Sequence, residues 1–220
     1  EPEYINTVED LAAKDFSSVP DNFVSVYHQS KMALLNEILN NGLTSRKTRG
    51  YSGSNSRKTR DQFFDHFADV EGVPSQWRRE TAVYATPTKK GFFRPDSSNV
   101  MVRQEVRELM LEVKVDPKKT LVVESDFFEA GDYKPITESG IPETNYAQDY
   151  WNSGMTLFKY RKLVSEGNPP NFKNPEIIIP AEEPIPLEFI KIQKTEAGST
   201  IPNKLYEVCP LASEQAALAE

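Results

Sequence analysis

Residues 22–43 switch from a strand pattern to a helix pattern, which fixes where two elements must begin and end. Aromatic and β-branched residues fill positions 23–27, and these types favour a half-buried strand. His28 follows directly, at the carboxyl end of the predicted strand and just ahead of a predicted helix. A polar side chain at such a position faces a crevice more often than a core. We therefore expect His28 to face a ligand-binding cleft.

The second half of this stretch predicts an amphipathic helix. Ser30 is a good N-cap, and leucine and isoleucine recur at helical spacing over residues 34–39. Gly42 stands where a left-handed residue ends a helix. The sequence therefore predicts a helix that begins at Ser30 and ends before Gly42.

The composition excludes several classes of protein. The 220 residues suit one domain, or one with extensions, and can bury a sizeable core. The single Cys209 excludes an internal disulfide, and two histidines leave little material for a zinc centre. A net charge of −7 argues against general nucleic-acid binding. No apolar run approaches the roughly 18–20 residues that a membrane helix needs, so we expect no membrane association and no metal.

The chain is expected to consist of a lead-in segment over residues 1–20, a catalytic domain over 21–195 and a C-terminal extension over 196–220. The first residues include no basic and apolar leader. We therefore expect a cytoplasmic protein, or one that is secreted without a visible signal peptide and acts in the cytosol of a target cell.

A basic segment over residues 44–60 contains the pentapeptide Ser-Arg-Lys-Thr-Arg twice, at 45–49 and 56–60. Glycines and serines between the copies favour a mobile loop. One interpretation is a solvated loop with a chance repeat. The other is a loop that binds an anion or a partner, since arginine side chains suit phosphate.

The rest of the chain predicts short strands, few helices and long loops. Strands are expected at 81–86, 120–124, 174–180 and 187–193, and helices at 61–70 and 146–164. Residues 100–116 fit a helix or an extended entry into a strand, with the strand at 120–124 as its hairpin partner or sheet neighbour. This pattern indicates an α+β fold and not an alternating α/β sheet.

Three residues stand out by their order and setting: His28 before a helix, Tyr84 in Val-Tyr-Ala-Thr, and Glu176 in Pro-Glu-Ile-Ile-Ile-Pro. Each alone has an ordinary structural explanation, as a strand end, a core tyrosine or a solvated strand start. Together, across roughly residues 22–193, they resemble the His-Tyr-Glu branch (diphtheria-toxin-like and PARP-like) of the ADP-ribosyltransferase superfamily. The resemblance implies a split sheet of short strands with flanking helices and long loops.

The resemblance also implies a reaction. Such a transferase cleaves NAD at the bond between nicotinamide and ribose and transfers ADP-ribose to a macromolecular acceptor, here a protein more than a nucleic acid. Glu176 would stabilise the oxocarbenium-like sugar, as carboxylates do in glycoside cleavage. Tyr84 would stack on the nicotinamide ring and His28 would bind the adenosine ribose. The residues expected to contact NAD are His28, Ser30, Tyr84, Thr86 and Phe92. A toxin or effector domain is the expected setting.

Three positions depart from the family pattern. Gln29 follows the histidine, where the family usually has glycine that allows close backbone approach to the nicotinamide amide. Phe92 and Phe93 lie where many members have a second tyrosine. Asn174 lies two residues before Glu176, where arginine-directed members have glutamate, so an arginine acceptor is not expected.

Two alternatives remain open. The first is a catalytically inactive interaction module with the transferase-like fold, which the departure at Gln29 and the missing second tyrosine favour. The second is an NAD-dependent RNA 2′-phosphotransferase, which needs several spaced arginine and histidine groups to grip a phosphate. The arginines of this chain gather in one segment, which argues against the second alternative.

Overall fold

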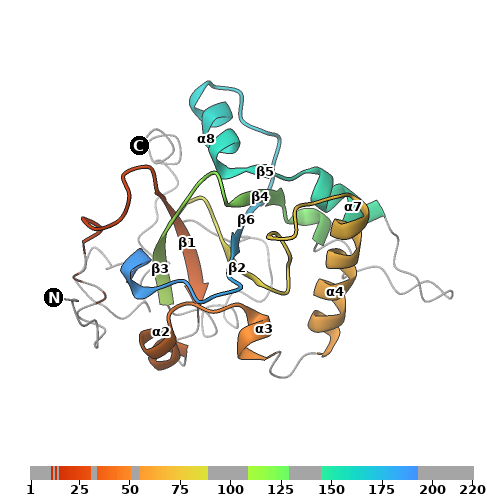
Figure 1. Cartoon of the computed structure of the whole chain (residues 1–220). Helices are drawn as coiled ribbons and strands as arrows, with labels where there is room; N and C mark the ends of the chain where they lie inside the picture. Colours follow the sequence, from red (N-terminus) through yellow and green to blue (C-terminus); the bar gives the residue numbers. More distant parts are fainter. Residues whose placement is uncertain are drawn as a thin grey trace, which may run out of the picture. The chain divides into compact units, whose positions relative to one another are not determined.

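The computed structural model describes residues 11, 13, 15–30, 34–50, 55–88, 109–128 and 145–192 (Figure 1). The helices and strands follow in this order: β1 (Val24–Ser30), α2 (Leu35–Asn41), α3 (Arg46–Arg49), α4 (Asn55–Val70), β2 (Ala82–Ala85), β3 (Leu109–Val115), β4 (Leu121–Glu124), α7 (Asn145–Asn152), β5 (Met155–Thr156), α8 (Leu157–Ser165), β6 (Pro175–Pro180), the 3₁₀ helix η2 (Leu187–Phe189) and β7 (Ile190–Ile192). The predicted α+β class is confirmed.

The chain forms two compact units, each assembled from segments that are distant in the sequence. The first unit draws on residues 1–44, 85–116 and 183–220, and the second on residues 45–84 and 117–182. One sheet, in the order β1-β3-β7, belongs to the first unit, and another, in the order β2-β6-β4-β5, to the second. The expected lead-in and C-terminal extension fall mostly or wholly outside the described residues.

In the first unit, β3 lies between β1 and β7 and pairs antiparallel with both. Its alternate residues are all buried: Leu109, Leu111, Val113 and Val115. The segment at 187–193, predicted as one strand, is instead the short helix η2 followed by β7, and only its last part joins the sheet. The helix-or-strand ambiguity of residues 100–116 is resolved as a strand from residue 109 onward.

β1 is longer than predicted, which corrects the expected role of Ser30. The strand continues through His28 to Ser30, and Ser30 pairs with Leu109 of β3. Ser30 is therefore the last residue of a strand and not the N-cap of a helix. The helix α2 begins later, and Leu34 at its N-cap position gives no side-chain hydrogen bond. The strand extends because β3 offers a backbone partner to every residue of β1.

The predicted helix end at Gly42 is confirmed. Gly42 has φ 76° and ψ −169°, a region that is accessible almost only to glycine, and its N–H donates to the carbonyl of Ile38. A Cβ at this position would lie 2.3 Å from the carbonyl oxygen of Ile185. The close approach allows Leu43 and Ile185 to exchange two backbone hydrogen bonds of 3.0 and 2.9 Å.

In the second unit, β4 is buried along its whole length and pairs antiparallel with both β5 and β6. The prediction that residues 120–124 form a hairpin or sheet neighbour with the preceding strand is therefore wrong. The predicted helix over 146–164 is also interrupted, by Gly154 and the two residues of β5. The hydroxyl of Thr156 then caps α8 by accepting from the N–H of Lys159.

The basic segment is helical on both sides of residues 51–54, which the structure does not describe. Its first copy forms α3, capped by the hydroxyl of Ser45, which accepts from the N–H of Thr48. Its second copy forms the first turns of α4. The expected mobile loop is thus replaced by helix within these two copies, because a serine N-cap and good helix formers outweigh the neighbouring glycines.

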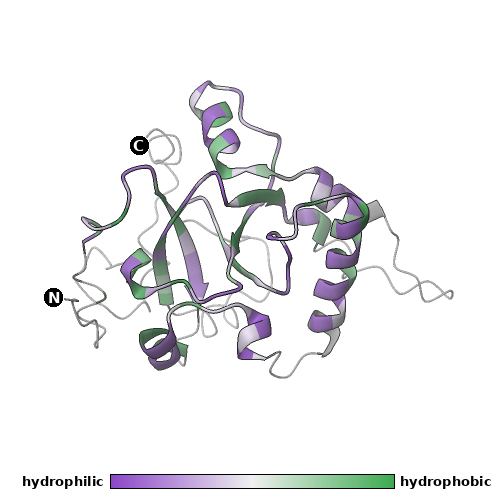
Figure 2. Ribbon diagram, viewed as in Figure 1, coloured by the Kyte–Doolittle hydropathy of each residue, from purple (hydrophilic) through white to green (hydrophobic). Residues whose placement is uncertain are grey.

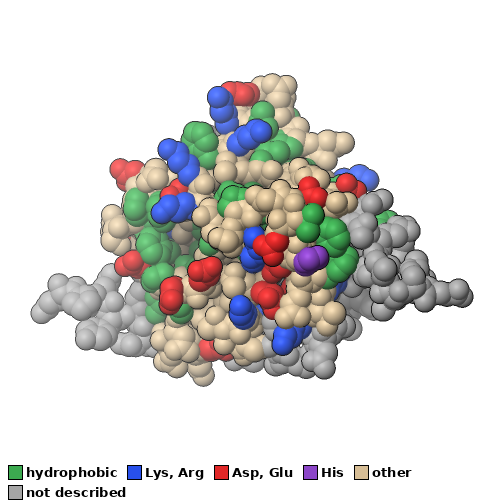
Figure 3. Space-filling view, turned by 45° about the vertical axis from the view of Figure 1, so that its right-hand side comes forward, with side chains coloured by type: hydrophobic (Ala, Val, Ile, Leu, Met, Phe, Trp, Pro, Cys, Tyr) green, Lys and Arg blue, Asp and Glu red, His purple; other side chains and the backbone are tan. Residues whose placement is uncertain are grey.

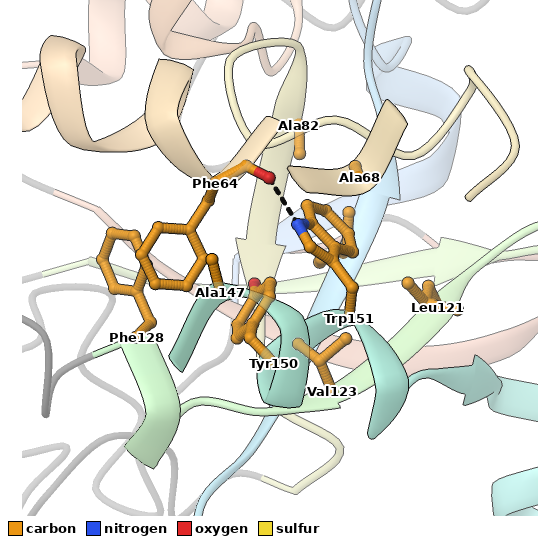
Figure 4. Packing of buried hydrophobic residues seen from close by; sticks show 10 residues of the cluster. Phe64, Ala68, Ala82, Leu121, Val123, Phe128, Ala147, Tyr150 and Trp151 are labelled. Atoms are coloured by element: carbon orange, nitrogen blue, oxygen red, sulfur yellow. Dashed lines mark hydrogen bonds between the residues drawn. The ribbon is translucent and has the colours of Figure 1, made fainter. Parts of the chain in front are cut away.

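A hydrophobic cluster of the second unit packs α4 and α7 over β4 and β6 (Figure 4). Aromatic edges meet aromatic faces at its centre: ring centroids lie 4.8 Å apart for Phe64 and Phe128, and 5.3 Å apart for Phe64 and Tyr150. The indole N–H of Trp151 donates to the carbonyl of Phe64, 2.6 Å away (Figure 4). In Figure 2, β4 is mostly hydrophobic, whereas α4 has a hydrophilic outer side.

Among the helices of the described residues, no helix combines the length and the apolar character that crossing a bilayer requires.

Replacing Gly42 with alanine is expected to destabilise the protein by more than the same change at Gly50. Both glycines have a positive φ with an extended ψ, so both variants bear a backbone strain of about 1–3 kcal/mol. Only Gly42→Ala adds an overlap with Ile185, whereas a Cβ at Gly50 meets no described atom within 4 Å. Urea unfolding of both variants measures the difference. Equal losses of stability would contradict the close approach at Ile185.

Candidate functional site

Glu176 is a buried carboxylate on β6 of the second unit, with 6% of its surface exposed. Its Oε1 accepts hydrogen bonds from Arg79 Nη1 at 2.7 Å and from the Tyr150 hydroxyl at 2.8 Å. Burial raises the pKa of Tyr150 well above that of an exposed phenol, so this hydroxyl keeps its proton and donates it. Both hydrogen bonds from described residues end on Oε1, and Oε2 accepts none from them.

Arg79 is the centre of the surrounding network. Its side chain is 2% exposed and contacts two carboxylates, with Nη1 on Glu176 and Nε donating to Asp61 Oδ1 at 3.0 Å. Nη1 also donates to the hydroxyl oxygen of Tyr150. A buried guanidinium is tolerated only where its charge and its N–H groups find partners, and here both neighbouring acids supply them.

Three aromatic rings surround the same guanidinium. Its central carbon lies 3.4 Å from the ring centroid of Phe128, 4.6 Å from that of Tyr84 and 5.0 Å from that of Tyr150. Arginine over aromatic faces gains a cation–π attraction that strengthens when water is excluded. The network therefore combines ion pairs, hydrogen bonds and aromatic contacts around one positive charge.

Tyr84 is connected to Glu176 through Arg79. The Tyr84 hydroxyl donates to the backbone carbonyl of Arg79 at 2.5 Å, and the Tyr84 ring lies beside the Arg79 guanidinium. Burial raises the pKa of the Tyr84 phenol well above its usual value, so this group also stays protonated. A second guanidinium, that of Arg46, lies 5.1 Å from the Tyr84 ring centroid. Two of the three residues singled out by the sequence are thus brought into one network.

Asp65 holds the backbone that leads into β2. Its two carboxylate oxygens accept hydrogen bonds from the N–H groups of Arg79, at 2.6 Å, and Glu80, at 3.0 Å. Burial raises the pKa of Asp65 to about 6, and the two backbone hydrogen bonds oppose that rise. The Asp65 side chain therefore fixes the position of Arg79 from the backbone side, while Asp61 and Glu176 fix its guanidinium.

The remaining predicted NAD contacts lie in the first unit. His28 is half-buried within β1, opposite Leu111, and Ser30 is buried at the end of that strand. Thr86 follows β2 and exchanges two backbone hydrogen bonds of 2.9 Å with Tyr27 of β1. Its hydroxyl donates to the carbonyl of Thr88 at 2.8 Å. Phe92 lies outside the described residues.

Gln29, the residue that departs from the family glycine, has a side-chain amide whose nitrogen and oxygen are both buried and find no hydrogen-bond partner among the described residues. A buried amide without partners is unfavourable by roughly 1–3 kcal/mol. Gln29 follows His28 in β1, and successive side chains of a strand point to opposite faces, so the amide lies on the other face of the sheet from His28.

Asn174, the other described residue that departs from the family pattern, makes hydrogen bonds within the fold. Its N–H donates to the carboxylate of Glu124, which also accepts from the N–H of Lys173. Its side-chain amide donates to Asp126 Oδ1 at 2.5 Å. Asn174, two residues before Glu176, and Glu124 thus tie the start of β6 to the end of β4.

A polar groove of about 430 Å³ adjoins the network in the second unit. Acidic and basic groups share its lining, which includes Asp65, Asp69, Arg78 and Glu182. Arg78 already pairs with Asp69 at 2.6 Å. Figure 3 shows a face of the molecule where acidic, basic and histidine side chains lie next to one another.

The sequence did not single out Arg79, Asp61 or Tyr150. Arg79 lies in a charged run directly before β2, and Tyr150 lies within the segment predicted as a helix over 146–164. No periodicity marks a buried arginine, because its burial depends on partners 18, 71 and 97 residues away. The sequence signal for Arg79 is a cationic residue directly before a strand, in a chain that also supplies acidic and aromatic residues as partners.

The described residues contain no cluster of three histidine, cysteine, aspartate or glutamate side chains arranged to hold a metal ion. A scan of the chain against protein-family models found no match, and searches of curated proteins and of solved structures found no similar protein either.

Asp65 gives the protein a specific dependence on pH. Because its pKa is about 6 in the folded protein and 3.8 as an ordinary aspartate, the folded state binds the additional proton between these values. The stabilisation is complete below pH 3.8 and is lost as the pH rises through 6. The stability of the wild type relative to Asp65→Asn is expected to fall by on the order of 2–3 kcal/mol between pH 4 and 7.

Asp69→Asn is the matched control, since Asp69 lies one helical turn later on α4 with a side chain that is 69% exposed. Urea unfolding at several pH values compares the three proteins. A constant difference between the wild type and Asp65→Asn would show that Asp65 titrates as an ordinary aspartate.

Proposed function

We propose that this chain is a mono-ADP-ribosyltransferase that cleaves NAD at the nicotinamide–ribose bond and transfers ADP-ribose to a protein acceptor. The observation that carries the proposal is that Arg79 connects Tyr84 to Glu176. Tyr84 lies on β2 and Glu176 on the neighbouring strand β6. These two residues are the ones to which the family resemblance assigns the nicotinamide ring and the reacting sugar.

The arrangement of strands supports the same proposal. A split sheet predicts two small groups of short strands, and the described residues form a three-stranded and a four-stranded sheet. His28 belongs to the first strand of one sheet, and Glu176 to a buried strand of the other. The ADP-ribosyltransferase-like form of the α+β fold is part of the proposal.

The reaction breaks the bond between C1′ of the ribose and the pyridinium nitrogen. The bonding electron pair leaves with neutral nicotinamide, and positive charge develops on the sugar. A nucleophile of the acceptor then bonds to C1′ and releases its proton to a base or to water. Glu176 would accept a hydrogen bond from a ribose hydroxyl through Oε2, and its negative charge would stabilise the sugar cation.

Tyr84 would stack on the nicotinamide ring only after Arg46 moves away from the Tyr84 ring. The guanidinium groups of Arg79 and Arg46 both lie near the Tyr84 ring. Arg46 is the more exposed of the two, with 28% of its side chain accessible, and is 3.7 Å from Asp61. A nicotinamide ring on Tyr84 would therefore displace Arg46, whose long side chain can turn toward water.

His28 would bind the adenosine ribose, and Ser30, Thr86 and Phe92 would complete the NAD contacts. A role as a toxin or effector in the cytosol of a target cell fits this activity.

One observation favours the alternative of an inactive interaction module. Glu176 is paired with Arg79 and nearly closed to solvent, and a carboxylate in a buried ion pair has a sufficient structural explanation. The RNA 2′-phosphotransferase alternative gains less support, because Arg46 and Arg60 contact the aromatic rings of Tyr84 and Phe128 within the second unit.

Glu176→Gln separates the enzyme from the inactive module. Glutamine keeps the acceptor for Arg79 and Tyr150 but removes the negative charge, so NAD cleavage is expected to fall by roughly 100-fold or more while NAD still binds. The rate of nicotinamide release from NAD, in the presence of a protein lysate, is the measurement.

Glu124→Gln is the matched control, because Glu124 is equally buried and lies on the adjacent strand β4. Its contacts are backbone N–H groups at the start of β6, so it should lose stability and keep its turnover per folded molecule. An equal fall in both variants, or retained turnover in Glu176→Gln, would contradict the assignment of Glu176.

A further inference from the structure

The orientation of the Glu176 carboxylate is set by other residues. A glutamate side chain has three rotatable bonds, and its two carboxylate oxygens are chemically equivalent in solution. In this structure Arg79 and Tyr150 both bond to Oε1, so the carboxylate has one fixed side and one side without a hydrogen bond from described residues.

The contacts around Oε1 form a closed triangle. Arg79 Nη1 donates to both Glu176 Oε1 and the Tyr150 oxygen, and the Tyr150 hydroxyl donates to the same Oε1. All three side chains are buried, so the hydrogen bonds lie in a region of low exposure to solvent. Hydrogen bonds in such a network reinforce one another and hold their members in one arrangement.

The triangle is held in place from outside by groups that do not contact Glu176. Asp61 is fully buried and accepts from Arg79 Nε, which fixes the rotation of the guanidinium. Asp65 holds the backbone of Arg79 and Glu80. Tyr84 donates to the Arg79 carbonyl, so the ring assigned to nicotinamide is fixed against the same residue.

We propose that Arg79 and Tyr150 are positioning residues that orient the Glu176 carboxylate, with Arg79 also setting its place relative to the Tyr84 ring. This inference rests on the proposed function. The physical reason is that electrostatic stabilisation of a sugar cation depends on a charge that is already in place, so that no group has to reorient during the reaction. Neither residue contacts the substrate in this assignment; both act through Glu176 and Tyr84.

A positioning role predicts that the variants change kcat and leave KM nearly unchanged. A group that aligns the carboxylate for the transition state changes kcat, whereas NAD affinity depends on other contacts. Tyr150→Phe removes one donor to Oε1 and keeps the aromatic ring in the cluster. It is expected to lower kcat for NAD cleavage roughly tenfold and to leave KM within about twofold.

Tyr160→Phe is the matched control. Tyr160 is a buried tyrosine of the same unit that stacks on Phe172, with ring centroids 6.0 Å apart. Tyr160→Phe removes a tyrosine hydroxyl outside the network around Glu176, so kcat per folded molecule should stay at the wild-type value. Arg79→Lys adds a second test. Lysine keeps the positive charge but loses the planar guanidinium, so this variant should retain more activity than Arg79→Met.

The wild type, these variants and Glu176→Gln are compared by initial rates of nicotinamide release, normalised to the folded fraction from circular dichroism. A lower kcat in Tyr150→Phe than in Tyr160→Phe, at unchanged KM, supports the inference. Equal kcat in the two variants, with Glu176→Gln inactive, overturns the positioning role and leaves the proposed function intact. Wild-type protein that releases no nicotinamide overturns both. If the Arg79 variants do not fold, the comparison of Tyr150→Phe with Tyr160→Phe tests the inference.

Discussion

The second unit depends on one buried positive charge. Arg79 is enclosed by Asp61, Glu176, Tyr150 and aromatic rings, and these partners come from α4, β6 and α7. Removing a single partner of a buried ion pair typically costs about 3–5 kcal/mol, because it leaves a charge without compensation. The helices and strands that supply the partners must therefore meet at Arg79, and the hydrophobic cluster around Phe64 and Trp151 packs against the same place.

A buried ion pair is weak evidence for stability, since apolar residues of similar volume often replace one without loss. Its presence here has a more specific explanation if Glu176 has to remain charged and oriented. The same arginine connects the carboxylate to Tyr84, the residue assigned to the nicotinamide ring. Arg79 is thus the residue through which the structure connects the two groups of the proposed chemistry.

The sequence predicted the fold class, the strands that contain Tyr84 and Glu176, and the helix end at Gly42, because each depends on local residue type and periodicity. Ser30 was assigned wrongly as a helix N-cap, since a strand partner 79 residues away extends β1 through it. The hairpin expected for β4 failed because its sheet partners are distant in the sequence. The mobile loop expected for the basic segment failed because a serine N-cap and good helix formers outweigh the glycines. Arg79 could not be found, since its function depends on side chains that only the folded chain brings together.

The binding of NAD to the wild-type protein tests the account most directly. Tryptophan fluorescence can follow it, because Trp151 lies beside Tyr150, with ring centroids 5.0 Å apart. The account predicts a saturable change in fluorescence with NAD, together with a rise in the unfolding temperature that depends on NAD concentration. Unchanged fluorescence and an unchanged unfolding temperature at millimolar NAD would contradict it.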